Sequence, residues 1–312
     1  MKNATVAVVG GVNVDIGGRP RAKLREADSN PGRVWLSVGG VGRNIAHNLS
    51  LLDVPVMLFT AYGEDAHGKL VEESCASAGI DLTRALKIKG GATPTYLFIT
   101  DETGEMRLAV ADMEACESIS PEYAERNKAL LNEAAAVVFD TNIPERTVEW
   151  LTENCTAPLF ADPVSTAKAG KLKNVLGRLY CVKPNRVEAE RLSGVHIENE
   201  RDMFTAADKL LETGLKELFI SDGANGVYAF AGGERVHIPS LPAQVKNTTG
   251  AGDAFMAGLI RGYLEGGTLY ERGLTAAMAA CISVESGSTV NPALSMEAIE
   301  KKKNELSGGK MT

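Results

Sequence analysis

The sequence predicts an α/β fold in which a mostly parallel sheet lies between two layers of helices and carries a small lid of β-strands. Strand-like apolar runs alternate with helical patterns over most of the 312 residues, as in parallel sheets covered on both faces. Two segments, residues 12–38 and 91–112, interrupt this alternation with strand patterns alone. We therefore expect a single domain over residues 1–312, with these two segments forming the lid.

The individual elements follow from local patterns. Short apolar runs predict strands at residues 6–9, 56–60, 135–140, 158–161, 180–182, 217–221 and 227–230. Apolar residues at helical spacing predict helices over residues 45–52, 70–78 and 203–211. In the lid, residues 96–100 and 106–110 flank a turn at residues 101–104, which predicts a hairpin. Residues 307–312 are expected to be a frayed tail.

The composition restricts the classes of partner. Lys and Arg number 33 against 40 Asp and Glu, a net charge of −7, which argues against nucleic acid as a partner. Apolar runs fall short of the roughly 20 residues that cross a bilayer, so we expect no membrane contact. The five cysteines are dispersed without C-x-x-C spacing, which supports neither a disulfide framework nor a zinc site. We expect a cytoplasmic protein that binds small molecules.

The strongest motif is N-T-T-G-A-G-D at residues 247–253, followed by an apolar stretch at residues 254–264 that predicts a buried helix. A glycine turn at a helix N-terminus presents backbone N–H groups and a positive dipole end, which suits an anion. Asp253 lies in the first turn, where it can accept a hydroxyl proton during phosphoryl transfer. This motif predicts a site for a phosphate group.

Two further motifs precede it in the chain. G-G-V-G-R-N at residues 39–44 enters a predicted helix, and its glycines, Gly40 and Gly42 among them, allow a ligand close to the backbone. Asn44 can donate and accept hydrogen bonds, as sugar hydroxyls require. G-V-N-V-D at residues 11–15 ends the first strand, where α/β sheets bind ligands, and Asp15 can accept hydrogen bonds from a sugar diol. The nucleotide motifs G-x-x-x-x-G-K-[ST] and strand-G-x-G-x-x-G do not occur, which disfavours P-loop enzymes and Rossmann dehydrogenases.

Together, G-x-x-N-x-D, G-G-x-G-x-N and T-G-A-G-D resemble the ribokinase-like carbohydrate kinases over essentially the whole chain. The resemblance implies a three-layer α/β/α fold with a β-sheet lid. It also implies ATP-dependent phosphorylation of a primary hydroxyl on a sugar or nucleoside, with Mg²⁺. Many relatives have Asp where this chain has Asn247, and there it helps to hold a monovalent cation, so a requirement for K⁺ stays open.

The resemblance also implies roles for individual residues. Asp253 is expected to be the catalytic base, and the anion hole is expected to comprise Gly250, Ala251 and Gly252. The residues expected to bind the substrate are Asn13, Asp15, Gly40, Gly42, Asn44 and Asn142. Those expected to bind the nucleotide are Asn185, Ser221, Gly223, Gly226, Thr248 and Asn291. Glu188, in N-x-x-E, is expected to organise Mg²⁺ through water; the less favoured alternative is that it is only an acidic residue at a helix start.

The polar trio Asp28, Ser29 and Asn30 could read the edge of a base from the lid. On the residues alone, an Asx turn is the favoured interpretation of the trio, and only the following resemblance reverses this preference. Several segments around it resemble one nucleoside-kinase subgroup of the family, which implies a C-linked uracil nucleoside, phosphorylated at its 5′-hydroxyl. The alternatives are another sugar or nucleoside kinase, for ribose or adenosine for example, and a non-catalytic sensor, although the intact Asp253 favours an enzyme. Relatives often pair their lids, so a homodimer through the lid is possible.

Overall fold

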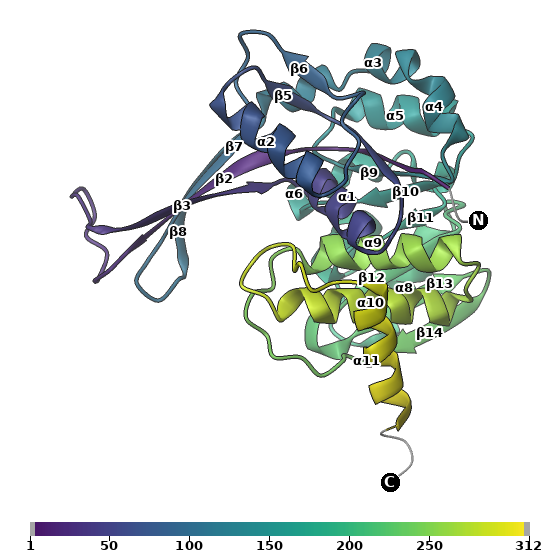
Figure 1. Cartoon of the computed structure of the whole chain (residues 1–312). Helices are drawn as coiled ribbons and strands as arrows, with labels where there is room; N and C mark the ends of the chain where they lie inside the picture. The colour runs from purple at the N-terminus through teal and green to yellow at the C-terminus, as the bar shows by residue number, and fades with distance from the viewer. Residues whose placement is uncertain (1–3, 309–312) are drawn as a thin grey trace.

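An eight-stranded sheet forms the centre of the structure, a computed structural model that describes residues 4–308 (Figure 1). Its strands, in spatial order, are β14 (Glu234–Ile238), β13 (Val227–Ala231), β12 (Glu217–Ser221), β11 (Cys181–Val182), β10 (Leu159–Asp162), β9 (Ala136–Asp140), β1 (Val6–Val9) and β4 (Val56–Phe59). The strands from β12 to β4 are parallel, and β13 pairs antiparallel with both neighbours. The parallel strands therefore end at one common edge of the sheet.

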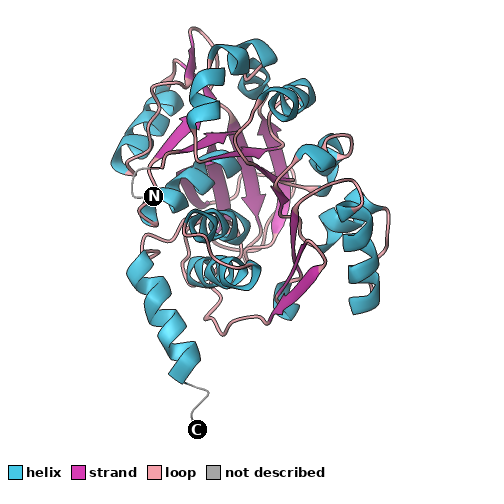
Figure 2. Cartoon of the chain, turned by 90° about the vertical axis from the view of Figure 1, so that its right-hand side faces the viewer, coloured by secondary structure: helices cyan, strands magenta, loops and turns pink. Residues whose placement is uncertain are grey.

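Helices cover both faces of this sheet, as the turned view in Figure 2 shows. Side chains along β1 alternate between two separate hydrophobic cores, Val6 and Val8 in one, Ala7 and Val9 in the other, because successive residues of a strand point to opposite faces. The first core includes α1 (Val41–Leu51), α2 (Ala66–Ser77), α9 (Ala251–Leu264), α10 (Leu269–Val284) and α11 (Met296–Gly308). The second includes α3 (Pro121–Arg126), α4 (Lys128–Glu133), α5 (Glu145–Asn154), α6 (Thr166–Ala169), α7 (Arg186–Ser193) and α8 (Glu200–Leu211). The predicted three-layer fold class is confirmed.

A second sheet of four strands projects from the body and forms the lid (Figure 1). Its strands, in spatial order, are β3 (Gly32–Gly39), β2 (Asn13–Pro20), β7 (Thr95–Thr100) and β8 (Met106–Asp112). The central pair β2–β7 is parallel, and the outer pairs are antiparallel. The expected hairpin is thus β7–β8. A two-stranded parallel sheet, β5 (Ala61–Gly63) and β6 (Leu86–Ile88), was not predicted.

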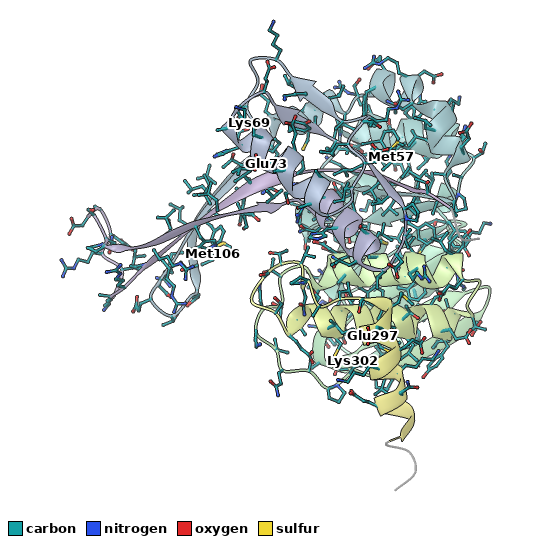
Figure 3. All side chains as sticks on the ribbon, in the orientation of Figure 1. Met57, Lys69, Glu73, Met106, Glu297 and Lys302 are labelled. Atoms are coloured by element: carbon teal, nitrogen blue, oxygen red, sulfur yellow. The ribbon has the colours of Figure 1, made fainter. Side chains whose placement is uncertain are left out.

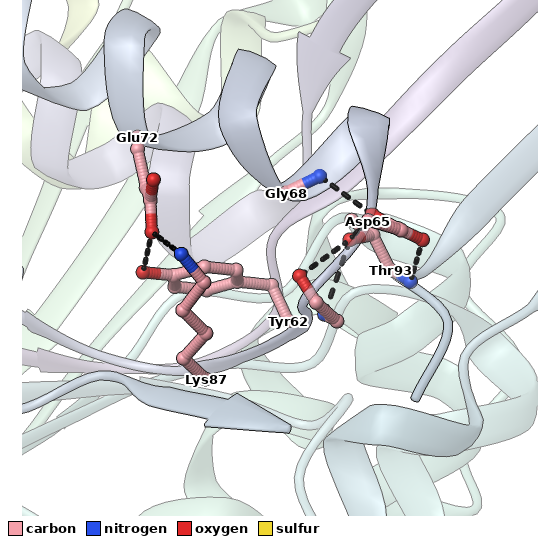
Figure 4. Close-up of polar contacts among 7 residues, drawn as sticks. Tyr62, Asp65, Gly68, Glu72, Lys87 and Thr93 are labelled. Carbon is pink, nitrogen blue, oxygen red and sulfur yellow. Dashed lines mark hydrogen bonds and ion pairs between the residues drawn. The ribbon is translucent and has the colours of Figure 1, made fainter. Parts of the chain in front are cut away.

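Asp65 joins α2 to the base of the lid (Figure 4). It is the N-cap of α2, and its Oδ1 accepts hydrogen bonds from the Gly68 amide at 2.7 Å and from Thr93 Oγ1 at 2.6 Å. Its Oδ2 accepts from the Thr93 amide at 2.9 Å. Thr93 lies two residues before β7, so this carboxylate fixes the point at which the lid strand leaves the body. Nearby, Glu72 Oε1 accepts from Tyr62 Oη and Lys87 Nζ, which ties α2 to β5 and β6.

Several predicted helices begin earlier in the structure than the apolar spacing indicated, and two further boundaries need correction. The helix of the glycine-rich motif begins at Ala251 rather than at residue 254, because Gly250 adopts a φ of 86° and acts as its N-cap. Ser307 and Gly308 continue α11, so the expected frayed tail was wrong for these two residues. The remainder of that tail, residues 309–312, lies outside the described residues. Within residues 4–308, the helices are all too short or too polar to span a membrane.

Four 3-10 turns complete the described elements: η1 (Glu114–Ser118), η2 (Gly170–Leu172), η3 (Leu176–Arg178) and η4 (Gly223–Asn225). The turn η4 follows β12 after one residue, at the edge where the parallel strands end. Three places in the fold carry residues that the sequence predicts to be functional. These are this edge of the sheet, the N-termini of α1 and α9, and the base of the lid.

Candidate active site

Three charged residues stand at the ends of adjacent parallel strands. Asp140 and Asp162 are paired in register on β9 and β10, and Lys183 directly follows β11. The residues two positions earlier, Val138, Phe160 and Cys181, all pack in the first core, which includes α1 and α9. The alternation of strand side chains therefore turns all three toward these two helices. All three are buried.

Asp253 meets this group from the first turn of α9. Its side chain is only 8% exposed, and its Oδ2 accepts a hydrogen bond from Asn44 Nδ2 at 2.9 Å. Asn44 lies in the first turn of α1, so the two glycine-led helix starts meet at this contact. Burial raises the pKa of Asp253 to about 8, and the charge of Asp162 adds to the shift. A carboxylate with such a pKa is a strong proton acceptor.

Lys183 supplies positive charge beside Asp253. Its Nζ lies 3.3 Å from Asp162 Oδ2, and both side chains are 7% exposed. Burial disfavours the ammonium form, but the neighbouring carboxylates, with Asp162 first among them, outweigh burial and raise the pKa of Lys183. A Cβ placed on Gly252 would lie 3.0 Å from this Nζ. The ammonium group therefore lies against the first turn of α9.

The turn before α9 can only be built with glycine. Gly250 has a left-handed φ of 86°, and a Cβ there would lie 2.1 Å from the Thr289 carbonyl oxygen. Ala251 and Gly252 then form the first turn, where backbone N–H groups have no carbonyl partner within the helix. With the helix dipole and Lys183 nearby, this turn suits a phosphate group.

Asp15 lies at the base of the lid, on β2. Its Oδ1 accepts a hydrogen bond from Asn13 Nδ2 at 2.6 Å. A Cβ on Gly39 of β3 would lie 2.2 Å from Asp15 Oδ2, so this glycine makes room for the carboxylate. Burial raises the pKa of Asp15, while Asn13 and Arg43 act in the opposite direction. Asp15 is half-buried, and its contact with a substrate stays a prediction.

Gly40, Gly42 and Asn142 surround the end of β1. Gly40 is the N-cap of α1 with a φ of 96°, and a Cβ on Gly42 would lie 2.8 Å from the Cα of Gly10. A Cβ on Gly11 would lie 3.2 Å from Asn142 Nδ2, so the loops after β1 and β9 are in contact. Asn142 Oδ1 accepts a hydrogen bond from Lys168 Nζ at 2.5 Å. The structure therefore brings these predicted residues to the edge that carries Asp140.

The predicted nucleotide residues form a neighbouring group. Asn185 and Glu188 make a capping box at the start of α7, each accepting a hydrogen bond from the other's backbone amide at 2.9 Å. An isolated bridge joins Asn185 to Ser221. Gly223 and Gly226, with φ of 53° and 91°, bound the turn η4 that follows Ser221. Burial raises the pKa of Glu188, and the charge of Asp162 adds to it, so these two carboxylates act on each other.

The last two predicted nucleotide contacts, Asn291 and Thr248, differ in how open they are to a ligand. Asn291 is buried, and its side chain bonds to the Ile282 carbonyl at 2.7 Å and to the Ala293 amide at 3.0 Å. This amide therefore holds the chain after α10. Thr248 is exposed and lies in the turn before α9, where its carbonyl accepts from the Ala251 amide at 3.3 Å. Asn247 Oδ1 likewise accepts from the Thr249 amide at 3.0 Å.

The trio Asp28, Ser29 and Asn30 is not brought to this cluster. The three residues lie in the loop between β2 and β3, at the outer end of the lid (Figure 1). Asn30 Nδ2 donates to the carbonyls of Arg25 and Asp28 at 2.8 and 3.0 Å, and its Oδ1 accepts from the Arg25 amide at 2.8 Å. The Ser29 amide donates to Asp28 Oδ1 at 2.7 Å. In the structure, these residues form a turn whose hydrogen bonds lie within the loop itself. Recognition of a nucleoside base by this trio stays a prediction.

Three residues of the site were missed from the sequence: Asp140, Asp162 and Lys183. The signal was present, because each ends or directly follows a predicted strand at residues 135–140, 158–161 or 180–182. Polar residues at that place in a parallel sheet meet at one edge. Charged residues at, or directly after, the ends of predicted parallel strands are therefore the signal that identifies all three.

The comparisons with known proteins identify the family. Residues 3–296 match the sequence profile of the pfkB family carbohydrate kinases. The chain belongs to this family. It is a ribokinase-family sugar or nucleoside kinase, a class that transfers a phosphoryl group to a hydroxyl.

Among curated proteins, pseudouridine kinase of Escherichia coli K12 is 36% identical over 293 residues, 93% of this chain and 94% of that protein. The uncharacterized sugar kinase YeiI of the same organism is 35% identical, covering 93% of this chain and 81% of that protein. A carbohydrate kinase from Agrobacterium tumefaciens has a similar structure, with a TM-score of 0.84, 31% identity and 96% and 97% coverage of the two chains. Arabidopsis thaliana ribokinase, complexed with ribose and ATP, shares the fold with a TM-score of 0.85, 23% identity and 96% and 98% coverage.

Proposed function

We propose that this protein transfers the γ-phosphoryl group of ATP to the 5′-hydroxyl of pseudouridine, giving pseudouridine 5′-phosphate and ADP. The observation that carries the kinase chemistry is the buried Asp253, held by Asn44 at the N-terminus of α9. The identity with the Escherichia coli pseudouridine kinase supports the choice of nucleoside.

In this proposal, each charged group has one task. Asp15 holds the ribose 2′- and 3′-hydroxyls, and the 5′-hydroxyl faces Asp253. As the 5′-oxygen forms its bond to the γ-phosphorus, the bond from that phosphorus to the β–γ bridging oxygen breaks, and the proton passes to Asp253. The first-turn amide of Gly252 and the Lys183 ammonium stabilise the charge on the transferring group, whereas the Ala251 amide already donates to the Thr248 carbonyl at 3.3 Å.

The residues present fit a magnesium ion near Glu188. Asp162 Oδ2 is buried and accepts no hydrogen bond within the described chain, so it has a free lone pair beside the ammonium of Lys183. Mg²⁺ prefers one or two carboxylates, with waters and phosphate oxygens completing its shell. Asp162 and Glu188 would hold it, directly or through water, where it would neutralise the nucleotide phosphates. Ser221 and the glycines of η4 are the proposed nucleotide contacts.

A panel of nucleosides and sugars offered with ATP and Mg²⁺ tests the proposal. It comprises pseudouridine, uridine, adenosine and ribose, with formation of the phosphorylated product measured for each. We expect the highest kcat/KM for pseudouridine. A higher value for ribose would instead support a sugar kinase, the alternative favoured by the 35% identity with YeiI. Binding of pseudouridine without any product would support a sensor.

The lid tip can be tested with the same panel. Replacing Asp28, Ser29 and Asn30 simultaneously by Ala is expected to reduce the ratio of kcat/KM for pseudouridine to kcat/KM for uridine. We expect this reduction to come mainly from a lower kcat/KM for pseudouridine. An unchanged ratio shows that the trio serves only the turn seen here.

We also propose that two copies of the chain pair through their lids. The lid face opposite Asp15 carries five exposed apolar side chains: Val34, Leu36, Leu97, Leu108 and Val110. Contiguous apolar surface of this kind mostly marks an interaction site, and a twofold axis would let one such face cover its equal. The molar mass in solution tests this. We expect a dimer that Leu36→Glu and Leu108→Glu convert to a monomer, and a wild-type monomer at all concentrations contradicts the proposal.

A further inference from the structure

An aromatic cluster occupies the lid face that carries Asp15. The sheet register pairs Gly17 of β2 with Trp35 of β3 and with Phe98 of β7. A Cβ on Gly17 would lie 2.3 Å from Trp35 Cε2 and 2.8 Å from Phe98 Cζ. Both rings therefore cover the backbone of Gly17, in space that a larger residue would fill. Asp15, two residues earlier on the same strand, points to the same face.

Tyr96 extends this cluster toward Asp15, with which it is paired in register. The ring centroids of Trp35 and Phe98 are 5.8 Å apart at 76°, and those of Tyr96 and Phe98 are 5.8 Å apart at 33°. Tyr96 Oη also contacts Met106 Sδ at 3.5 Å. Figure 3 shows Met106 below the lid, on the side away from α2 with its labelled Lys69 and Glu73. The three rings are half-buried, so part of each ring is open to a ligand.

The spacing of the two features matches a nucleoside. Residues two apart on a strand are roughly 6.5 Å apart along it, so the rings over Gly17 lie one such step from Asp15. A ribose held at its hydroxyls by Asp15 would place a planar base over the aromatic cluster. A free sugar would reach Asp15 and Asp253 and leave the rings uncovered.

We propose that Trp35, Phe98 and Tyr96 form a stacking surface for the base and make the protein favour nucleosides over free sugars. This inference rests on the proposed function, because it assumes a nucleoside substrate. Stacking uses the face of the ring, which every base presents, so this surface raises affinity for nucleosides in general. Discrimination between pseudouridine and uridine then falls to groups that meet the ring edge.

Substitutions at Trp35 test the stacking surface. Trp35→Leu keeps an apolar side chain but removes the aromatic face, whereas Trp35→Phe keeps it. We expect Trp35→Leu to lower kcat/KM for pseudouridine about 10- to 100-fold, the effect of removing one stacked aromatic side chain. Trp35→Phe should retain most of the activity, and KM for ATP should stay within about twofold in both variants.

Fluorescence gives an independent reading, because the chain has two tryptophans, Trp35 and Trp150. Trp150 lies on α5 in the opposite helix layer, beside Lys128, so Trp150→Phe is a matched tryptophan substitution away from the lid. In Trp150→Phe, the emission comes from Trp35 alone. We expect added pseudouridine to change the Trp35 emission in a saturable manner. Ribose at the same concentration should leave this emission unchanged.

Each outcome decides the proposal. Unchanged pseudouridine kinetics in Trp35→Leu, or equal losses in Trp35→Leu and Trp35→Phe, overturn the stacking role, and in both cases nucleoside turnover by the wild type leaves the proposed function standing. If KM for ATP rises in Trp35→Leu as much as KM for pseudouridine, the rings only stabilise the lid. This result also overturns the stacking role. If the wild type phosphorylates ribose but no nucleoside, the proposed function itself fails and the stacking role fails with it.

Discussion

Asn44 donates a hydrogen bond of 2.9 Å to the carboxylate of Asp253, 209 residues further along the chain. The contact joins the first turns of α1 and α9, which pack against each other at the carboxyl edge of the parallel sheet. It fixes the orientation of the proposed base and partly offsets the cost of burying its charge. Two of the three glycine-rich motifs of the sequence therefore meet at one point of the fold.

Asp253→Asn is expected to reduce kcat by about 10²- to 10⁴-fold, because an amide cannot accept the proton of the attacking hydroxyl. Pseudouridine binding should persist, which equilibrium titration can measure. The variant should also have a higher melting temperature at pH 7, since it removes a carboxylate whose raised pKa shows that burial disfavours its charge. Near wild-type kcat in a correctly folded variant would exclude Asp253 as the base.

The pH profile should follow the ionisation of Asp253. Because its pKa is raised to about 8, the base is mostly protonated at neutral pH. In the free enzyme, kcat/KM should rise about tenfold per pH unit below pH 8 and level off above it. Folding stability should change in the opposite sense. A raised carboxyl pKa contributes stability below the unfolded value of 3.8 that is lost as the pH rises toward 8. A profile that is flat from pH 6 to 9 would contradict this assignment.

Asp15→Ala should chiefly weaken binding of the nucleoside. Each hydrogen bond to a charged group contributes about 1.5–3 kcal/mol, so KM for pseudouridine should rise at least about tenfold. KM for ATP should change little. Parallel increases in both constants would show that Asp15, through Asn13, only supports the base of the lid.

Glu188→Gln should lower kcat and shift its Mg²⁺ dependence to higher concentration, because the amide is a weaker ligand for a hard cation. The glutamine can still accept a hydrogen bond from the Asn185 amide, so the capping box, and with it the melting temperature, should be largely preserved. A Mg²⁺ titration identical to that of the wild type would leave Glu188 with its capping role alone.

Gly250→Ala should destabilise the turn before α9. The left-handed φ of 86° costs a residue with a Cβ roughly 1–2 kcal/mol, and the Thr289 carbonyl, 2.1 Å from that Cβ, adds a steric clash. We expect a lower melting temperature together with a loss of kcat. Gly232→Ala is a matched control, because Gly232 also has a positive φ, of 55°, but its Cβ would meet open space. Equal effects at both positions would argue against a special role of the turn at Gly250.

The sequence by itself determined the parts of this protein that depend on neighbouring residues. The alternation of strands and helices, the lid segments and the three glycine-rich motifs are local patterns, so β12 was predicted at its observed bounds and Asp253 was placed on the first turn of its helix. Glycine turns and helix starts are local too, because backbone conformation and capping act over a few residues.

Only the tertiary structure decided which charges meet. Asp140, Asp162 and Lys183 come from three separate strands, and parallel pairing carries their ends to one edge, where the neighbouring carboxylates outweigh burial and raise the pKa of Lys183. The lid shows the same division. The sequence shows that residues 28–30 are polar, but only the fold shows that Asn30 donates hydrogen bonds to carbonyls within the turn at the outer end of the lid. Strand register, which no short motif encodes, placed Trp35 and Phe98 over Gly17 on the face of Asp15.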